Sequence, residues 1–331
     1  MPSLFQSLPG KRLPVSELSA QLEHLWELDW EKEREGPTVV HASRMNLILH
    51  LGPATSVSEA QAQFKKSICF AQRYPCRIII LCAEEENSGD KVFEGKLFSQ
   101  CYIGNSLRER CCCEVLMLSY PPSGSTFLEN QISIWLESDL PVYYWFHRVP
   151  LDRIEKYYLP LISKVRRAVY DSSIEDDDYR KLDWPDSMSI RDLADARNLP
   201  IRQFIGQFLS TFDPALLIDG LQGVRVTREK NKKGEATNLL EWQCACLEDC
   251  CRQAGREGQP ITYHSRMAEP TSGISLQTEW FYNNGKNFCW YWKEAQETGM
   301  ITADFGQGLI RYPQQMKTPP PDITLGEAFF F

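Results

Sequence analysis

Continuous apolar runs alternate with helical patterns in the first half of the chain. The runs Met45–Leu51, Arg77–Ala83 and Val142–Phe146 have the length of buried strands, and a helical pattern lies between the first two. Uninterrupted apolar strands joined by a helix are typical of a parallel sheet that is covered on both faces. The pattern therefore predicts an α/β domain over residues 1–173, with a mostly parallel sheet and flanking helices.

The second half of the chain changes to a mixture of helices and alternating strands. An acidic segment, residues 174–189, is expected to form the interdomain connection. A helix over Ile190–Ala196 should follow, and the later turn Asn283-Asn284-Gly285 is a strong hairpin signal. The pattern predicts an α+β domain with an antiparallel meander over residues 190–312. Residues 313–331 are rich in proline and are expected to form an extended tail.

Composition and charge narrow the class of protein. The chain has 331 residues, of which 43% are hydrophobic and 24% charged, which is ordinary for a globular protein. Its net charge of −8 argues against nucleic-acid binding, which depends on Lys and Arg contacts to phosphate. No apolar run approaches the ~20 residues that a membrane-spanning helix needs, and no signal peptide is recognised. A cytoplasmic protein without membrane contacts is expected.

The twelve cysteines do not follow a metal-binding pattern, because the sequence has no Cys-x-x-Cys and only five histidines. In a reducing compartment they are expected to be free thiols that pack as small hydrophobic residues. Neighbouring cysteines on one strand are poorly placed to bridge, so packing is favoured there too. Glu114 beside them needs a polar partner if it is buried, and a structural ion pair or hydrogen bond is favoured over a catalytic acid. The candidates for the alternative, a redox role, are Cys111, Cys112, Cys113, Cys250 and Cys251.

Catalytic and cofactor motifs are missing from the sequence. It contains no glycine-rich dinucleotide fingerprint, no P-loop, no H-E-x-x-H and no G-x-S-x-G. No catalytic, cofactor-binding or metal-binding residue is therefore assigned. Ligands of parallel sheets collect beyond the carboxyl ends of the strands, where His147 and Arg148 are the candidates for an anion or partner contact and Asp171 is a further participant if the cleft binds a ligand.

Several segments match the pattern of one known family in the same order along the chain. They are Arg44–Leu47, Tyr74–Leu81, Glu109–Glu114, Asp139–Trp145, Arg167–Ser173, Ser189–Leu193 and Phe204–Asp213. Over roughly residues 40–215 the chain thereby resembles the OpcA family of glucose-6-phosphate dehydrogenase assembly proteins. The sequence departs from the family at Tyr74, Cys76 and His147, and its tail ends in three phenylalanines.

This resemblance implies a non-catalytic protein that needs no cofactor. Family members promote the active oligomer of glucose-6-phosphate dehydrogenase and so the supply of NADPH through the oxidative pentose phosphate pathway, and some are linked to thiol-based control. Assembly factor and allosteric activator of that enzyme is therefore the leading hypothesis. The candidate partner contacts are Trp145, His147, Arg148, Trp280, Tyr282, Trp290 and Trp292.

Two alternatives remain open. The first is a sugar-phosphate-binding α/β protein or enzyme that uses the strand-end cleft near His147 and Arg148. The second is a thiol switch. The sequence leaves the oligomeric state of the chain itself unassigned.

Overall fold

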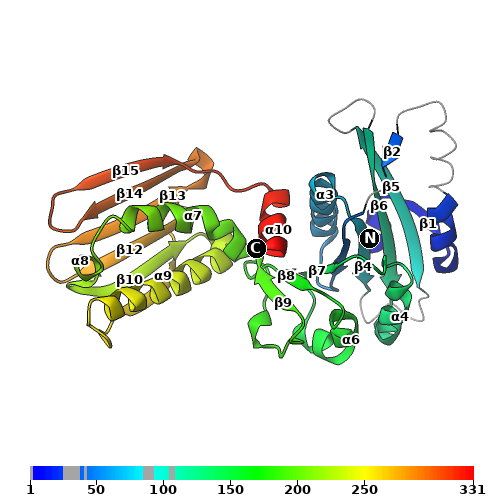
Figure 1. Ribbon diagram of the computed structural model, residues 1–331, viewed down its shortest axis with the longest axis horizontal. Coiled ribbons are helices and arrows are strands. Elements are labelled where there is room, and N and C mark those ends of the chain that lie inside the picture. The colour runs from blue at the N-terminus through cyan, green and yellow to red at the C-terminus, as the bar shows by residue number, and fades with distance from the viewer. Residues whose placement is uncertain (1–2, 25–37, 41–42, 85–92, 104–108) are drawn as a thin grey trace. The chain divides into compact units, whose positions relative to one another are not determined.

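The computed structural model describes residues 3–24, 38–40, 43–84, 93–103 and 109–331. The chain divides into two compact units, each of which is discontinuous in sequence. Unit 1 comprises Met1–Asp171, Glu175–Asp192 and Pro321–Phe331, and unit 2 comprises Ser172–Ile174 and Leu193–Pro320. Figure 1 shows the helices and strands of both units.

Unit 1 is built on a mixed sheet, which has nine strands in the described part of the chain. Its order is β1-β5-β6-β4-β3-β7-β8-β9, with β2 paired to β6. The strands are β1 (Lys11–Leu13), β2 (Thr38–Val40), β3 (Asn46–Leu51), β4 (Arg77–Ala83), β5 (Glu94–Ile103), β6 (Glu109–Tyr120), β7 (Val142–His147), β8 (Arg167–Tyr170) and β9 (Ser189–Asp192). β3 is parallel to both of its neighbours, β4 and β7. Because the chain adds β4 on one side of β3 and later β7 on the other, the topological switch point lies between β3 and β7.

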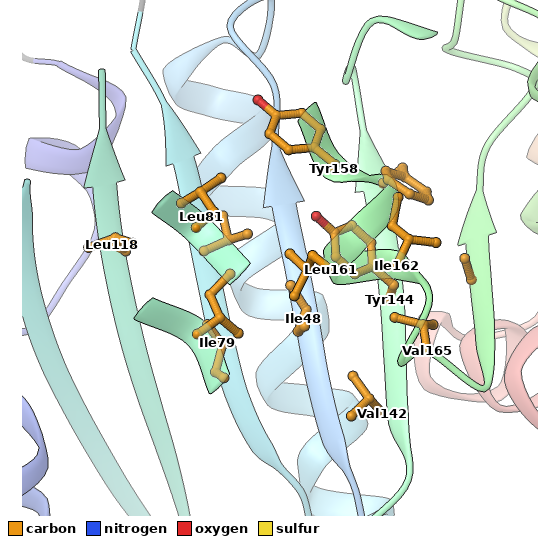
Figure 2. Close-up of a cluster of buried hydrophobic side chains, with 14 of the residues drawn as sticks. Ile48, Ile79, Leu81, Leu118, Val142, Tyr144, Tyr158, Leu161, Ile162 and Val165 are labelled. Carbon is orange, nitrogen blue, oxygen red and sulfur yellow. The ribbon is translucent and has the colours of Figure 1, made fainter. Parts of the chain in front are cut away.

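Helices cover both faces of this sheet. They are α1 (Leu4–Ser7), η1 (Val15–Glu17), α3 (Val57–Arg73), η2 (Pro122–Phe127), α4 (Leu128–Ser133), α5 (Leu151–Arg153), η3 (Ile154–Tyr158), α6 (Leu159–Ile162), η4 (Tyr179–Lys181) and α10 (Pro321–Phe330). Alternate strand side chains, among them Ile48 and Ile79, form one buried cluster with α4, η3 and α6. Figure 2 shows this cluster on one face of the sheet and a long helix, α3, behind the other.

The helix α10 belongs to unit 1 and packs beside α3. Its Phe329 and Phe330 contact an aromatic group made of Phe70, Tyr74 and Tyr143. The prediction of an extended tail is therefore wrong for Pro321–Phe330. Proline suits the first position of a helix, because its φ angle is already helical and no backbone N–H is needed there, so the prolines in this segment mark the helix start.

Unit 2, which the structure describes throughout, has a six-stranded sheet in the order β11-β10-β12-β13-β14-β15. The strands are β10 (Leu221–Arg228), β11 (Thr262–Met267), β12 (Leu276–Tyr282), β13 (Asn287–Lys293), β14 (Thr298–Asp304) and β15 (Ile310–Gln315). The helices are α7 (Leu193–Leu209), α8 (Pro214–Ile218), η5 (Lys230–Lys232), α9 (Lys233–Gln253) and η6 (Glu294–Gln296). The strands from β10 to β15 are antiparallel, except that β11 is parallel to β10.

One face of the second sheet carries the core of unit 2. Apolar side chains of α7, α8 and α9 pack there against alternate residues of the strands, such as Val224, Trp290 and Ile301. In Figure 1, α7 and α9 lie over the strands of this unit. Gln243 of α9 is buried in the same layer, where its Oε1 accepts hydrogen bonds from Thr278 and Trp280, both at 2.8 Å.

These observations confirm the predicted fold class, an α/β unit followed by an α+β unit with an antiparallel meander. Two local expectations differ from the structure. Ile190–Asp192 were expected to begin a helix but lie in β9, because Ser189–Asp192 pair in parallel with β8. The acidic segment is more than a connection, since Glu175–Asp192 belong to unit 1 and Tyr179 is fully buried in its core.

Candidate functional site

The switch point of the unit 1 sheet lies between the carboxyl ends of β3 and β7, where open α/β folds bind their ligands. β3 is followed by Gly52 and leads to the N-terminus of α3, while β7 ends at His147 and is followed by Arg148. The structure therefore brings the two predicted strand-end residues to this position. What matters for function is whether the switch point has room for a ligand.

Gly52 and Arg148 are packed backbone to backbone. The N–H of Gly52 donates to the carbonyl oxygen of His147 at 2.8 Å. A Cβ atom on Gly52 would lie 1.8 Å from the carbonyl oxygen of Arg148, so only glycine fits. Arg148 itself has a φ of 53°, a left-handed conformation that non-glycine residues seldom adopt. The ends of β3 and β7 are therefore in direct backbone contact.

A carboxylate of the chain itself occupies the N-terminus of α3. Glu59 Oε2 accepts hydrogen bonds from the N–H and the hydroxyl of Ser56, at 2.9 and 2.8 Å. Glu59 Oε1 accepts from Nε and Nη2 of Arg148 at 2.8 and 2.7 Å. Burial alone would raise the pKa of Glu59, but these hydrogen bonds outweigh it and lower the pKa to about 2. Glu59 and Ser56 thus form a capping box, which places a carboxylate paired with Arg148 at the helix N-terminus.

A second carboxylate, Glu175, holds the unusual backbone of Arg148. Its Oε1 accepts the Arg148 backbone N–H at 2.7 Å, and its side chain is buried. Burial raises the pKa of Glu175 to about 7, although the Arg148 N–H and guanidinium act in the opposite direction. The carboxyl group therefore titrates near neutrality, at a point where it holds the end of β7 in place.

The substitution Glu175→Gln is expected to stabilise the protein at pH 8 relative to pH 5. Because the pKa of Glu175 is higher in the folded than in the unfolded state, its stabilising effect is complete below the unfolded value and is lost as the pH rises through about 7. Glutamine keeps the acceptor oxygen and does not titrate. The variant should therefore gain about 2 kcal/mol over the wild type between pH 5 and pH 8, measured by urea unfolding at both values. A difference that is the same at both pH values would contradict the raised pKa.

Two predicted partner contacts on β7 lie in the interior. His147 and Trp145 are 1% and 2% exposed, because β7 is a central strand of the sheet. Neither ring nitrogen of His147 has a hydrogen-bond partner among the described residues, and burial lowers its pKa to about 4. The prediction that His147 and Trp145 face a partner is wrong for the folded chain. Arg148 is partly exposed, but its guanidinium is already paired with Glu59.

The predicted aromatic contacts on the hairpin of unit 2 are also mostly core residues. Trp280, Trp290 and Trp292 are 4%, 0% and 4% exposed and belong to the buried cluster under α7 and α9. Tyr282 is half-buried and donates its hydroxyl to the carbonyl oxygen of Leu217 at 2.8 Å. The expectation that these tryptophans are exposed is therefore wrong, since side chains at positions two apart on a strand share one face.

The residues between these tryptophans lie on the opposite face of the same sheet. We call this the open face, because α7, α8 and α9 all pack against the other face in unit 2. The side chains on the open face include Arg225 of β10, Phe281 of β12, Tyr291 and Lys293 of β13, Met300 of β14 and Arg311 of β15. Their side chains are half-buried or exposed. The alternation in Asn287–Lys293, large aromatics at one parity and polar residues at the other, is the signal that could have identified this face.

The cysteines of the β5–β6 hairpin differ from expectation. Cys112 forms a disulfide with Cys101, which lies directly opposite it in the register of the hairpin. The prediction of free thiols is therefore wrong for these two residues, and Cys101 was not among the candidates. Cys113 is buried and forms no disulfide, as expected from packing, and the side chain of Cys111 lies outside the described residues.

The disulfide has a direct chemical test. Peptide mapping of the unreduced protein, with free thiols blocked before digestion, is expected to recover Cys101 linked to Cys112. Cys76 should be found alkylated only after unfolding, because its side chain is buried. Recovery of Cys101 and Cys112 as separate alkylated peptides would contradict the pairing.

The remaining redox candidates lie on α9. Cys250 is half-buried and Cys251 is buried, and burial raises the pKa of both thiols. A raised pKa lowers the thiolate fraction and with it the reactivity of a cysteine. Their redox role stays a prediction. In the described ranges, no group of three or more His, Cys, Asp or Glu residues is arranged to hold a metal ion. Nor does any described helix combine the length and apolar character needed to cross a bilayer.

Comparison with known proteins gives one match that bears on the family. Residues 69–184 match the family model described as the glucose-6-phosphate dehydrogenase subunit N-terminal domain. No curated protein sequence matches the chain.

Two solved structures share a broad similarity with the chain. A glucose-6-phosphate 1-dehydrogenase from Mycobacterium avium has a TM-score of 0.47 at 9% identity, with 87% of this chain and 87% of that chain covered. A dipicolinate-bound dihydrodipicolinate reductase from Paenisporosarcina sp. TG-14 has a TM-score of 0.32 at 7% identity, with 86% of this chain and 92% of that chain covered. Because both TM-scores are below 0.5, neither similarity is used to assign a fold or a function. The family match, in contrast, confirms over residues 69–184 the resemblance to the OpcA family of glucose-6-phosphate dehydrogenase assembly proteins that was found in the sequence.

Proposed function

We propose that this chain is a non-catalytic assembly factor and allosteric activator of glucose-6-phosphate dehydrogenase in the cytoplasm. It binds the active oligomer of the enzyme and thereby raises NADPH production in the oxidative pentose phosphate pathway. The observation that carries the proposal is the family match over residues 69–184. The geometry of the switch point supports it, since the guanidinium of Arg148 is already paired with Glu59 and the two strand ends are in close backbone contact at Gly52 and Arg148.

The mechanism requires only preferential binding. A protein that binds the active oligomer more tightly than the inactive form shifts the equilibrium toward the active oligomer. Moving a population from 1:99 to 99:1 takes about 5.5 kcal/mol of differential affinity. No group of the chain has to react with the substrate of the enzyme.

The test is reconstitution of the purified full-length chain with the dehydrogenase of its own organism. Light scattering after size exclusion should show a joint complex, and the dehydrogenase should gain activity when it is diluted to the point where its oligomer dissociates. Bovine serum albumin at equal concentration is the crowding control. A dehydrogenase whose oligomeric state and rate are the same with and without the chain would overturn the proposal.

The sugar-phosphate alternative is tested with the same preparation. The isolated chain is titrated with glucose 6-phosphate by calorimetry, and no specific binding is expected, because an anion would have to displace Glu59 from Arg148. Binding that the substitution His147→Ala abolishes would favour a metabolite site at the switch point instead.

A further inference from the structure

The open face of the unit 2 sheet has an apolar centre. Tyr291, Met300 and Pro313 lie side by side across β13, β14 and β15, because they are directly paired in the register of the sheet. They form the apolar part of a hollow of about 620 Å³, whose remaining lining is mostly polar and includes Glu297 and Gln315. On β12, Phe281 is 40% exposed, and the guanidinium of Arg225 lies 4.4 Å from its ring centroid. Aromatic and arginine side chains of this kind are enriched in the centres of protein–protein interfaces.

The charge of this face is opposite to that of the whole chain. The Arg, Lys, Asp and Glu side chains that the strands place on it are Arg225, Arg266, Glu279, Lys293, Asp304 and Arg311. Four cations beside two carboxylates leave an excess of two positive charges, on a chain whose net charge is −8. Glu279 already pairs with Arg225 at 2.9 Å. Lys293 and Arg311 form no ion pair with any described residue, so their charges are available to a partner.

The size of the face is close to what a specific contact needs. Strands lie about 4.8 Å apart and rise about 3.3 Å per residue, so a sheet of this size presents roughly 24 Å by 20 Å. This projected area of roughly 500 Å² grows when the relief of the side chains is included, and a standard interface needs about 600–1,000 Å² from each partner. The open face therefore supplies most of the area that the lower end of that range requires.

We propose that the open face is a docking surface for a folded protein whose own surface has an apolar centre flanked by carboxylates. The inference rests on the proposed function, under which this acidic surface belongs to glucose-6-phosphate dehydrogenase. A second copy of the chain docked open face to open face is not the occupant, because the two faces would bring their excess positive charges together. The apolar centre supplies the buried area, and Lys293 and Arg311 supply the orientation and the charge selectivity.

The inference is tested by reversing the two unpaired charges. The double variant Lys293→Glu and Arg311→Glu is expected to weaken binding of the full-length chain to the dehydrogenase at least about tenfold, with a smaller salt dependence than the wild type. The matched control is Lys65→Glu with Lys181→Glu, which makes the same change in net charge at exposed lysines of unit 1. The control should bind as the wild type does, and both variants should retain the wild-type unfolding midpoint.

Several outcomes would overturn the inference. If the wild type and the open-face variant bind the dehydrogenase equally well, or the control loses as much affinity, the docking surface is wrong while the proposed function stands. If the wild type does not bind at all, the proposed function fails and the inference fails with it. A dimer of the chain alone that the open-face variant disrupts would identify a second copy as the occupant and overturn the inference as well.

Discussion

Replacement of Gly52 by alanine is expected to destabilise unit 1 by at least about 3 kcal/mol or to prevent it from folding. The added Cβ would lie 1.8 Å from the carbonyl oxygen of Arg148 and 2.8 Å from the Cα of Val149. Both obstacles are backbone atoms, so no rotation of a flexible side chain relieves the overlap. The end of β3 would have to separate from the end of β7, which breaks the hydrogen bond from Gly52 to His147.

The measurement is urea unfolding followed by tryptophan fluorescence. Gly206→Ala is the control, because a Cβ there meets only Trp242 at 3.9 Å inside α7, and alanine is expected to stabilise a helix by about 0.5–1 kcal/mol. An unfolding midpoint for Gly52→Ala close to that of the wild type would mean that the two strand ends are not in contact in solution.

The largest electrostatic effect is expected from Arg77→Met. Arg77 is buried at the start of β4, where its guanidinium lies 2.9 Å from Glu137 Oε1 and 3.9 Å from Glu114 Oε2. It also donates to the carbonyl oxygen of Trp135 at 3.1 Å. Methionine has a similar length but no charge, so the buried carboxylate of Glu114 loses the cation of Arg77. Loss of one partner of a buried ion pair typically costs about 3–5 kcal/mol.

A second substitution distinguishes this electrostatic effect from loss of packing. In the double variant Arg77→Met with Glu114→Gln, the buried negative charge is also removed, and a large part of the lost stability should return. The exposed pair Arg252 and Asp249, 2.9 Å apart, provides the control, since Arg252→Met should change stability by less than about 1 kcal/mol. If the double variant is no more stable than Arg77→Met alone, the uncompensated charge is not the cause.

The regular elements of unit 1 could be predicted because their signals are local. The apolar runs of β3, β4 and β7 have the composition of buried strands, and the structure places them side by side in the sheet centre. The expected partner for Glu114 is also confirmed, because an isolated carboxylate within an apolar strand is rarely tolerated without a cation or donor. β9 lacked such a signal, since only its pairing with β8 distinguishes Ser189–Asp192 from the start of α7.

The candidate sites were harder to predict, because they depend on pairing over distance. The disulfide follows from the register of the β5–β6 hairpin, which places Cys101 opposite Cys112, and the sequence does not specify that register. The exposed aromatics of unit 2 depend on which parity of β13 faces the helices. The sequence identified the right hairpin but assigned its tryptophans, rather than Phe281 and Tyr291, to the surface. The pairing of Arg148 with Glu59 could not be predicted from the sequence, because it depends on the end of β7 lying beside the first turn of α3.

The position of α10 has a consequence for biosynthesis. Residues 321–331 complete unit 1, yet the ribosome reaches them only after all of unit 2 has been made. Until then the aromatic surface formed by Phe70, Tyr74 and Tyr143 lacks its cover and is exposed to solvent or chaperones. The nascent N-terminal half therefore cannot reach its final state by itself, and a fragment that stops at Asp192 should be recovered mainly in inclusion bodies.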